Sequence, residues 1–153
     1  MSEFTTSSPI GFLTVTECNG AISSITFGGR AESAPDTPLL REAKRQLDEY
    51  FAGSRRVFDL PLSPRGTEFQ RRVWSALETI PYGETRTYAQ IAAVIGSPKA
   101  CRAVGMANHC NPLPIVIPCH RVIGSGGQLT GYAGGLDTKQ YLLTLEQNAK
   151  TDG

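Results

Sequence analysis

The spacing of apolar and polar residues divides the chain into a β-rich first part and a mostly helical second part. Residues 12–16 and 22–27 are runs rich in β-branched side chains, and Asn19-Gly20 between them is a hairpin turn signal. Residues 39–51 carry apolar side chains at helical spacing. Residues 57–62 predict one further short strand. The first part is therefore expected to form a small antiparallel sheet with one helix.

The second part carries clear helix start signals. Thr67 to Gln70 and Thr87 to Gln90 both have the capping-box pattern, and the second of them opens a short helix that ends at Gly96. Ser97-Pro98 provides an N-cap residue and a proline for the first turn of another helix. Asp137 can cap a last helix. These signals predict an α+β protein, with domains at 1–63 and 64–153 separated by the linker-like Ser63-Pro64-Arg65-Gly66.

Two of the predicted helices have only Gly96-Ser97 between them, which is typical of a helix-turn-helix. The second of these helices has an apolar stripe at i, i+3, i+4 and i+7, formed by Ala100, Ala103, Val104 and Ala107. Its opposite face carries Lys99, Arg102 and Met106, with Gly105 alongside. Small residues would let this face approach a DNA groove closely. An ordinary helical hairpin with a solvated arginine has the same pattern, so the alternative stays open.

Composition restricts the class of protein further. The chain has 153 residues, 40% of them hydrophobic, and no apolar stretch approaching the length of a membrane span. The first six residues lack a basic leader, so we expect a cytoplasmic protein with four reduced cysteines. The net charge is +1, but residues 65–122 carry +4. This modest basic segment is compatible with a polyanionic partner and equally with ordinary scatter of surface charge.

Cys119 is the strongest candidate for chemistry. It lies in Pro118-Cys119-His120-Arg121, directly after the apolar run Ile115-Val116-Ile117, which predicts a strand that delivers the thiol to a sharp bend. The thiolate is the reactive form of cysteine, and neighbouring positive charge lowers a thiol pKa. The sequence therefore predicts an activated nucleophile. The alternative is a buried, inert cysteine.

The residues from Asn111 to Val122, with the Pro-Cys-His-Arg core, resemble the active-site signature of the O6-alkylguanine-DNA alkyltransferases, also called methylated-DNA–protein-cysteine methyltransferases. The similarity covers about residues 66–147. It includes the motifs Ile80-Pro81-Tyr82-Gly83, Arg102-Ala103-Val104-Gly105, Gly131-Tyr132-x-Gly134-Gly135 and Leu142-Leu143-x-Leu145-Glu146. Ser8-Pro9-Ile10-Gly11 is similar, less specifically, to the start of the family's N-terminal domain.

This resemblance implies a DNA repair protein with double-stranded DNA as its partner. Such a protein docks in the minor groove through the helix-turn-helix and flips O6-alkylguanine, with O4-methylthymine as a further substrate, into a pocket. The cysteine takes the alkyl group irreversibly, in a single turnover. No cofactor is expected. No metal is expected either, because the sequence has no C-x₂-C spacing and its N-terminal part lacks the Cys/His cluster of the zinc-binding relatives. Without a long apolar stretch, no membrane partner is expected. We expect a monomer, for which clustering on DNA stays open.

The resemblance also assigns roles to individual residues. Cys119 is the alkyl acceptor, His120 a base acting through water, Glu146 the residue that orients the imidazole, Asn111 a brace, and Tyr88 a proton donor to the departing guanine. Because neighbouring strand residues point to opposite faces, His120 is not expected to touch the sulfur directly. Arg102 is the finger that fills the gap left by the flipped base. Further DNA contacts are expected from Lys99, Ala103, Gly105 and Met106. The pocket is expected to be lined by Tyr132, Pro114, Val122 and Ala133.

Ala133 departs from the serine of certain relatives, so one hydroxyl near the alkylated oxygen is missing. Two other classes remain to be weighed. A non-catalytic lesion binder of the alkyltransferase-like type would commonly carry tryptophan in place of the reactive cysteine. A Cys–His hydrolase would need an oxyanion hole, and no motif in the sequence indicates one.

Overall fold

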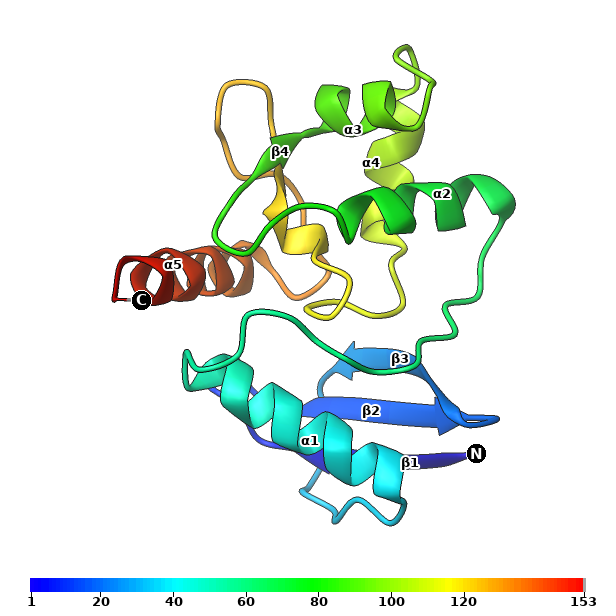
Figure 1. Cartoon of the computed structure of the whole chain (residues 1–153), viewed down its shortest axis with the longest axis vertical. Helices are drawn as coiled ribbons and strands as arrows, with labels where there is room; N and C mark the ends of the chain where they lie inside the picture. Colours follow the sequence, from blue (N-terminus) through cyan, green and yellow to red (C-terminus); the bar gives the residue numbers. More distant parts are fainter. Residues whose placement is uncertain (153) are drawn as a thin grey trace. The chain divides into compact units, whose positions relative to one another are not determined.

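The computed structural model of the protein describes residues 1–152 and separates the chain into two compact units, residues 1–65 and the part that begins at Gly66. The α+β fold predicted from the sequence is confirmed (Figure 1). Within the described residues, no helix is both long and apolar enough to cross a membrane.

The first unit is a three-stranded antiparallel sheet with a helix. Its strands are β1 (Ser2–Thr6), β2 (Leu13–Cys18) and β3 (Ala21–Phe27), in that order across the sheet. The turn between β2 and β3 is at Asn19-Gly20, as predicted, and both residues have positive φ (53° and 80°), as a type I′ hairpin requires. Strand β1 was not predicted.

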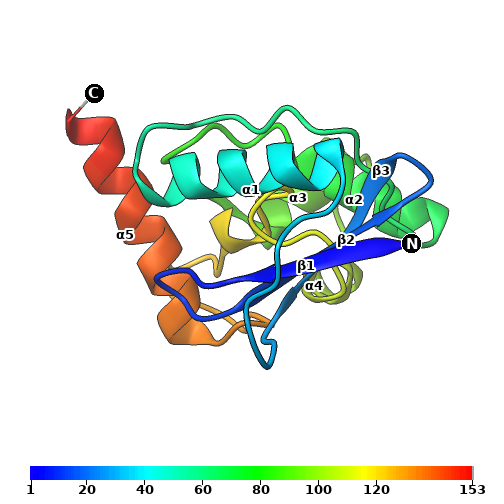
Figure 2. The same cartoon turned by 90° about the horizontal axis from the view of Figure 1, so that it is seen from below.

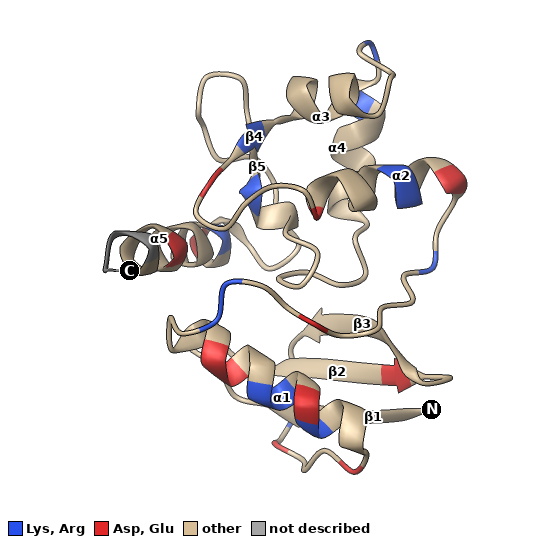
Figure 3. Ribbon diagram, viewed as in Figure 1, with Lys and Arg blue, Asp and Glu red and all other residues tan. Residues whose placement is uncertain are grey.

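One face of this sheet is apolar and packs against the helix. Phe4 pairs with Val15, and Val15 with Ile25, so the three side chains form one buried row across the strands. The helix α1 (Pro38–Phe51) contacts all three strands and lies alongside the sheet (Figure 2). Thr37 caps it by accepting a hydrogen bond from the Leu40 amide at 3.0 Å. The exposed side of α1 carries charges of both signs, paired at i, i+3 and i, i+4 spacing (Figure 3).

The strand predicted over residues 57–62 is wrong. This segment contributes only an isolated bridge between Leu62 and Ile22. The buried Gln46 side chain donates to the Asp59 carbonyl at 3.0 Å and accepts from the Asp59 amide at 2.8 Å. Since these backbone groups bind a helix side chain, they are not available to a strand ladder.

The second unit begins with helix α2 (Glu68–Leu77) and continues through β4 (Arg86–Thr87) into α3 (Tyr88–Val94). Both predicted capping boxes are confirmed: Thr67 and Gln70 bind each other's backbone amides, and so do Thr87 and Gln90. Helices α2 and α3 both contact the next helix, α4 (Cys101–His109).

Helix α4 starts later than the sequence predicts. Ser97 does not cap it, because the Ser97 carbonyl accepts from the Ala100 amide at 2.9 Å and closes a tight turn. The first backbone bond of α4 runs from the Val104 amide to the Ala100 carbonyl at 2.8 Å, and no side chain caps the helix. Lys99 therefore lies before the helix. Ala103, predicted on the apolar stripe, is exposed.

Three further elements complete the second unit. They are η1 (Cys119–Arg121), β5 (Val122–Ile123), which pairs in parallel with β4, and α5 (Leu136–Asp152). Asp137 lies in the first turn of α5 and not before it, so it does not occupy the predicted cap position.

Candidate active site

Cys119 opens a single 3₁₀ turn that is buried in the second unit. The strand predicted just before it, over Ile115 to Ile117, is wrong: Ile115 has a φ of 75°, and the Ile117 amide donates to the Leu113 carbonyl at 2.9 Å. These apolar residues are buried because they form part of the core, not because they belong to a sheet. The thiol is therefore presented by a compact turn.

The side chain of Asn111 holds this turn together. Its amide nitrogen donates to the Ile117 carbonyl at 2.8 Å, and its amide oxygen accepts from the Leu113 amide at 3.0 Å. The Asn111 side chain also lowers the pKa of the Cys119 thiol. One buried amide thus satisfies the polar groups of a turn that no regular secondary structure could satisfy.

The thiol of Cys119 is protonated in the free protein. Burial raises the pKa of Cys119 to about 11, and only partial compensation comes from the hydrogen bonds of Asn111 and Tyr132 and from the charge of Lys139. The expectation that adjacent positive charge would lower this pKa is therefore wrong. Its premise fails because Arg121 is paired with a carboxylate and His120 is held neutral.

His120, Arg121 and Glu146 form one buried cluster. His120 Nε2 lies 2.6 Å from Glu146 Oε2. Arg121 donates from Nε to Glu146 Oε1 at 2.8 Å and from a terminal nitrogen to Oε2 at 3.0 Å, and it also donates to the Ile80 carbonyl at 2.7 Å. His120 and Glu146 have no exposed side-chain surface. Paired charges of this kind are the usual form in which ionised groups are buried.

The turn after α2 completes the environment of the carboxylate. The Gly83 amide donates to Glu146 Oε1 at 3.1 Å, and the φ of Gly83 is 78°, a conformation that favours glycine. Arg121 lies over the ring of Tyr82, with 5.6 Å between the guanidinium carbon and the ring centroid. The sequence motif Tyr82-Gly83 therefore supports the cluster from a segment more than 60 residues away from Glu146 along the chain.

The ionisation states of the cluster follow from these contacts. Burial raises the pKa of Glu146, but the hydrogen bonds and charges of His120 and Arg121 outweigh burial and lower it well below its usual range. Burial lowers the pKa of His120, which the Glu146 carboxylate only partly offsets. Since an ionised carboxylate can only accept, His120 Nε2 carries the hydrogen and Nδ1 is left as an acceptor. Nδ1 is buried and has no partner within the described protein.

Lys139 and Asn108 belong to this region, and neither was predicted. Lys139 is fully buried, and its ammonium donates to the Val122 carbonyl at 2.6 Å and to the Thr130 carbonyl at 3.2 Å. Asn108 donates to the Cys119 carbonyl at 3.3 Å. A signal for Lys139 existed, because it lies three and seven residues before Leu142 and Glu146, on the same face of α5.

The two tyrosines predicted for the site lie on different segments. Tyr132 is buried near the Cys119 thiol and lowers the pKa of that thiol. Tyr88 is the first residue of α3, and its hydroxyl lies 2.5 Å from the hydroxyl of Thr130. The other residues predicted to line a pocket divide by exposure: Pro114 and Val122 are buried, and Ala133 is exposed.

The residues predicted to contact DNA lie on or just before α4. Lys99, Arg102, Ala103 and Met106 are exposed, and Met106 retains 64% of its surface. Gly105 is partly exposed, and a methyl group added there would lie 3.9 Å from two ring carbons of Tyr88. The buried face of the helix is formed by Val104, Ala107 and Asn108.

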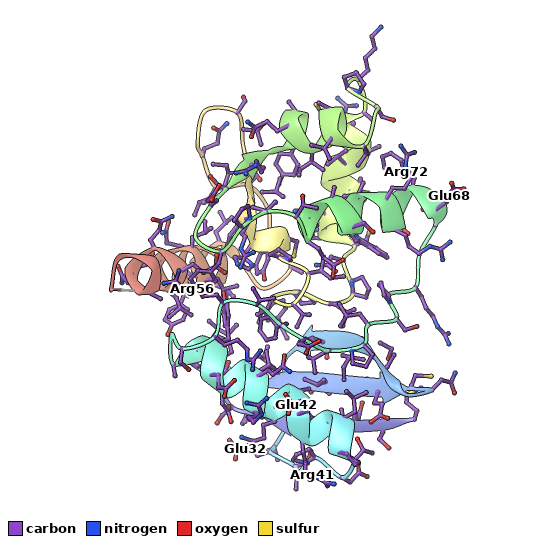
Figure 4. The ribbon with its side chains drawn as sticks, in the orientation of Figure 1. Glu32, Arg41, Glu42, Arg56, Glu68 and Arg72 are labelled. Atoms are coloured by element: carbon purple, nitrogen blue, oxygen red, sulfur yellow. The ribbon has the colours of Figure 1, made fainter. Side chains whose placement is uncertain are left out.

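The second unit also has a pocket beside α2, lined by residues away from Cys119 in sequence. It is lined by α2 side chains that include Glu68 and Arg72 (Figure 4), and Arg72 donates to the Ile95 carbonyl. Its lining contains no cysteine or histidine. Among the side chains that the structure describes, residues 1–149, no three His, Cys, Asp or Glu gather as a metal-ligand set.

Comparison with known proteins assigns both parts of the chain. Residues 1–64 match the ribonuclease-like domain of 6-O-methylguanine DNA methyltransferase, and residues 68–148 match its DNA-binding domain. A methylated-DNA–protein-cysteine methyltransferase of Methanosarcina acetivorans is 53% identical over 91% of this chain and 94% of that protein. The constitutive enzyme of Bacillus subtilis is 63% identical over 73% of this chain and 68% of its own length.

Solved structures agree with these matches. The crystal structure of Mycobacterium tuberculosis OGT in complex with DNA has a TM-score of 0.87 and 49% identity, covering 95% of this chain and 92% of that one. An O6-methylguanine DNA methyltransferase from Methanococcus jannaschii has a TM-score of 0.65 and 30% identity, covering 96% and 90%. Fold and sequence thus define a DNA-binding transferase that moves an alkyl group from DNA to a protein cysteine. The chain belongs to the 6-O-methylguanine DNA methyltransferase family, and its function lies in DNA repair.

Proposed function

We propose that this protein flips O6-alkylguanine out of duplex DNA and transfers the alkyl group irreversibly to its own Cys119, once per molecule. O6-methylguanine is the expected substrate, with O4-methylthymine as a further one. The observation that carries this proposal is a single thiol, buried on a turn that the Asn111 side chain holds, directly before the His120–Glu146 pair. We assign this reaction to residues 64–153.

Proton removal is the first requirement of the reaction, because the thiol is neutral at rest. With a pKa of about 11, the thiolate is on the order of one molecule in ten thousand near neutral pH. His120 is neutral, and its Nδ1 is free to accept a proton, so we assign it as the base that acts through a water molecule. The imidazolium that forms is stabilised by Glu146 at 2.6 Å, which is the role of a carboxylate in a Cys–His–Glu arrangement.

Alkyl transfer then follows as a displacement at carbon. The sulfur–carbon bond forms as the bond from carbon to guanine O6 breaks, and the electron pair goes to the guanine. Tyr88 is the proposed donor of the proton that the departing guanine takes up. The product thioether has no route back to a thiol, so each molecule reacts once.

Access to a stacked base requires that the base leave the helix. Unstacking costs a few kcal/mol, which groove contacts must offset. The exposed face of α4 is the proposed docking surface in the minor groove. Arg102 is its finger, with contacts from Lys99, Ala103, Gly105 and Met106. Tyr132, Pro114, Val122 and Ala133 are the proposed lining for the flipped base. We propose a monomer as the acting species, and clustering along DNA is a further possibility to be measured.

Intact-mass spectrometry tests the chemical step. After mixing with duplex DNA that contains O6-methylguanine, the protein should gain the mass of one methylene group, mapped to the peptide that contains Cys119. Cys119→Ser should bind the duplex and gain nothing, while Cys110→Ser, which removes an exposed thiol, should react like the wild type. A modified Cys110, or methyl removal by Cys119→Ser, would contradict the proposal. More than one lesion processed per molecule would contradict the single turnover.

The finger role is tested separately by Arg102→Ala. This variant should slow transfer from duplex DNA much more than transfer from a single strand, where no base has to be extruded. An equal loss on both substrates would argue against the role.

A further inference from the structure

Thr130 makes two polar contacts that connect separate parts of the site. Its hydroxyl lies 2.5 Å from the hydroxyl of Tyr88, and its carbonyl accepts from the ammonium of Lys139 at 3.2 Å. Tyr88 opens α3, and Lys139 lies near the start of α5. Thr130 itself is in neither helix, so it joins the loop after β5 to both of them. No motif in the sequence pointed to this residue.

The backbone of Thr130 is held on the side of the molecule where Cys119 lies. The same Lys139 ammonium donates to the Val122 carbonyl at 2.6 Å, and Val122 directly follows the turn that contains Cys119. Lys139 is fully buried, so loss of either carbonyl would leave its ammonium short of a hydrogen bond inside the protein. These contacts hold the backbone of Thr130, and the contact with Tyr88 selects the position of its hydroxyl.

The ring of Tyr88 is positioned by other means. Two ring carbons lie within van der Waals distance of the place where a side chain at Gly105 would begin. The capping box at Thr87 and Gln90 determines the start of α3 and hence the direction in which Tyr88 leaves the helix. What these contacts leave open is the direction of the phenolic hydrogen, since either hydroxyl of the Tyr88–Thr130 pair can be the donor.

We propose that Thr130 is a positioning residue for alkyl transfer: its hydroxyl donates to the Tyr88 oxygen and so directs the Tyr88 hydrogen to the departing guanine. This inference rests on the proposed function, in which Tyr88 supplies that proton. As the carbon–O6 bond breaks, the electron pair goes to guanine, and the guanine takes the phenolic hydrogen. The negative charge left on the Tyr88 oxygen is then stabilised by the Thr130 hydroxyl, and water later returns a proton to the phenolate. A donor already in place needs no reorganisation at that moment.

Single-turnover kinetics with a duplex that contains O6-methylguanine test the inference. Thr130→Val keeps the shape of the side chain and the carbonyl that binds Lys139, and it removes only the hydroxyl. The transfer rate at saturating DNA should fall about five- to tenfold, the loss expected for one hydrogen bond of ordinary strength. Thr130→Ser should stay within about twofold of the wild type, since one hydroxyl replaces another. Thr144→Val, at an exposed threonine of α5, is the matched control and should react normally.

The double variant separates positioning from a structural role. In a Tyr88→Phe background, Thr130→Val should cause no further loss, because the hydroxyl that it serves is gone. The DNA concentration for half-saturation should be unchanged in Thr130→Val. Thermal melting should verify that the variant folds, and if it does not, Thr130→Ala replaces it and should show the same kinetic loss.

Three results would overturn the inference: a Thr130→Val rate equal to that of the wild type, an undiminished effect in the Tyr88→Phe background, or a loss confined to DNA affinity. Failure of the proposed function itself looks different, because the wild-type protein would then acquire no methyl group on Cys119.

Discussion

The reactivity of Cys119 in the absence of DNA should be low and should rise steeply with pH. Burial raises the pKa of this thiol to about 11. Relative to the ordinary value of 9.0 for this group, the higher pKa lowers the thiolate population near neutral pH roughly 100-fold and corresponds to about 3 kcal/mol. Since only the thiolate is alkylated, the rate should climb about tenfold for each pH unit between pH 7 and pH 10.

Iodoacetamide labelling of the DNA-free protein, read by peptide mass spectrometry at a series of pH values, measures this directly. Cys110 is exposed and serves as the internal reference for reagent quality and dose. The variant Lys139→Met removes a positive charge that lowers the pKa of Cys119, so its labelling curve should lie further toward high pH. Melting of each sample must show that the protein is folded over the range used.

A Cys119 rate that levels off below about pH 9 would refute this reasoning, because it would require a thiol pKa no higher than that of an exposed cysteine. Rapid labelling near neutral pH would have the same meaning. Either result would show that the hydrogen bonds and the Lys139 charge outweigh burial, and the proposed need for a water-mediated base would then disappear.

Three further predictions concern the cluster and the docking helix. Glu146→Gln leaves the Arg121 guanidinium buried without its carboxylate. The variant should lower the free energy of unfolding by about 3–5 kcal/mol, measured by urea titration. A loss below about 1 kcal/mol would show that the Arg121–Glu146 pair does not stabilise the fold as a buried ion pair does. In the wild type the folded-state pKa values of His120 and Glu146 are both lowered. The contribution of His120 to the free energy of unfolding is therefore complete above about pH 6.5 and that of Glu146 above about pH 4.3, and each is lost as pH falls below that value. A free energy of unfolding that stays constant on acidification from neutral pH to about pH 4 would contradict this sign. Gly105→Ala should raise the free energy of unfolding by about 0.5–1 kcal/mol, because alanine is favoured over glycine in a helix interior and the added methyl group would lie 3.9 Å from Tyr88. The same variant should bind duplex DNA more weakly, as measured by fluorescence anisotropy. A destabilised Gly105→Ala protein would show that the methyl group does not fit.

Local signals predicted the helices well. The two capping boxes and the Asn19-Gly20 turn depend on neighbours within three residues, and each has the predicted structure. The same local reasoning failed at Ser97-Pro98, where a good cap sequence closes a turn because the Ala100 amide binds the Ser97 carbonyl. It also failed at Ile115, where an apolar run is buried in a turn that the Asn111 side chain stabilises.

In the candidate site, too, some residues could be predicted from the sequence and others could not. The Pro-Cys-His-Arg motif and its resemblance brought Cys119, His120, Asn111 and Glu146 forward as candidates. The structure pairs His120 with Glu146, and the Asn111 side chain holds the turn that leads to Cys119. Lys139 was not identified, although its spacing to Leu142 and Glu146 indicated a shared helix face.

The sequence by itself determined the fold class and the family and brought one cysteine forward as the candidate nucleophile, because helix caps, turn residues and an unusual tetrapeptide are readable over a few positions. Only the tertiary structure decided the ionisation of the site. His120 and Arg121 stand next to the thiol in sequence, yet burial keeps His120 neutral, and the carboxylate of Glu146, some 25 residues further on, pairs with the charge of Arg121. Burial and pairing depend on which distant segments meet, and they raise the thiol pKa where the adjacent residues alone predicted the opposite.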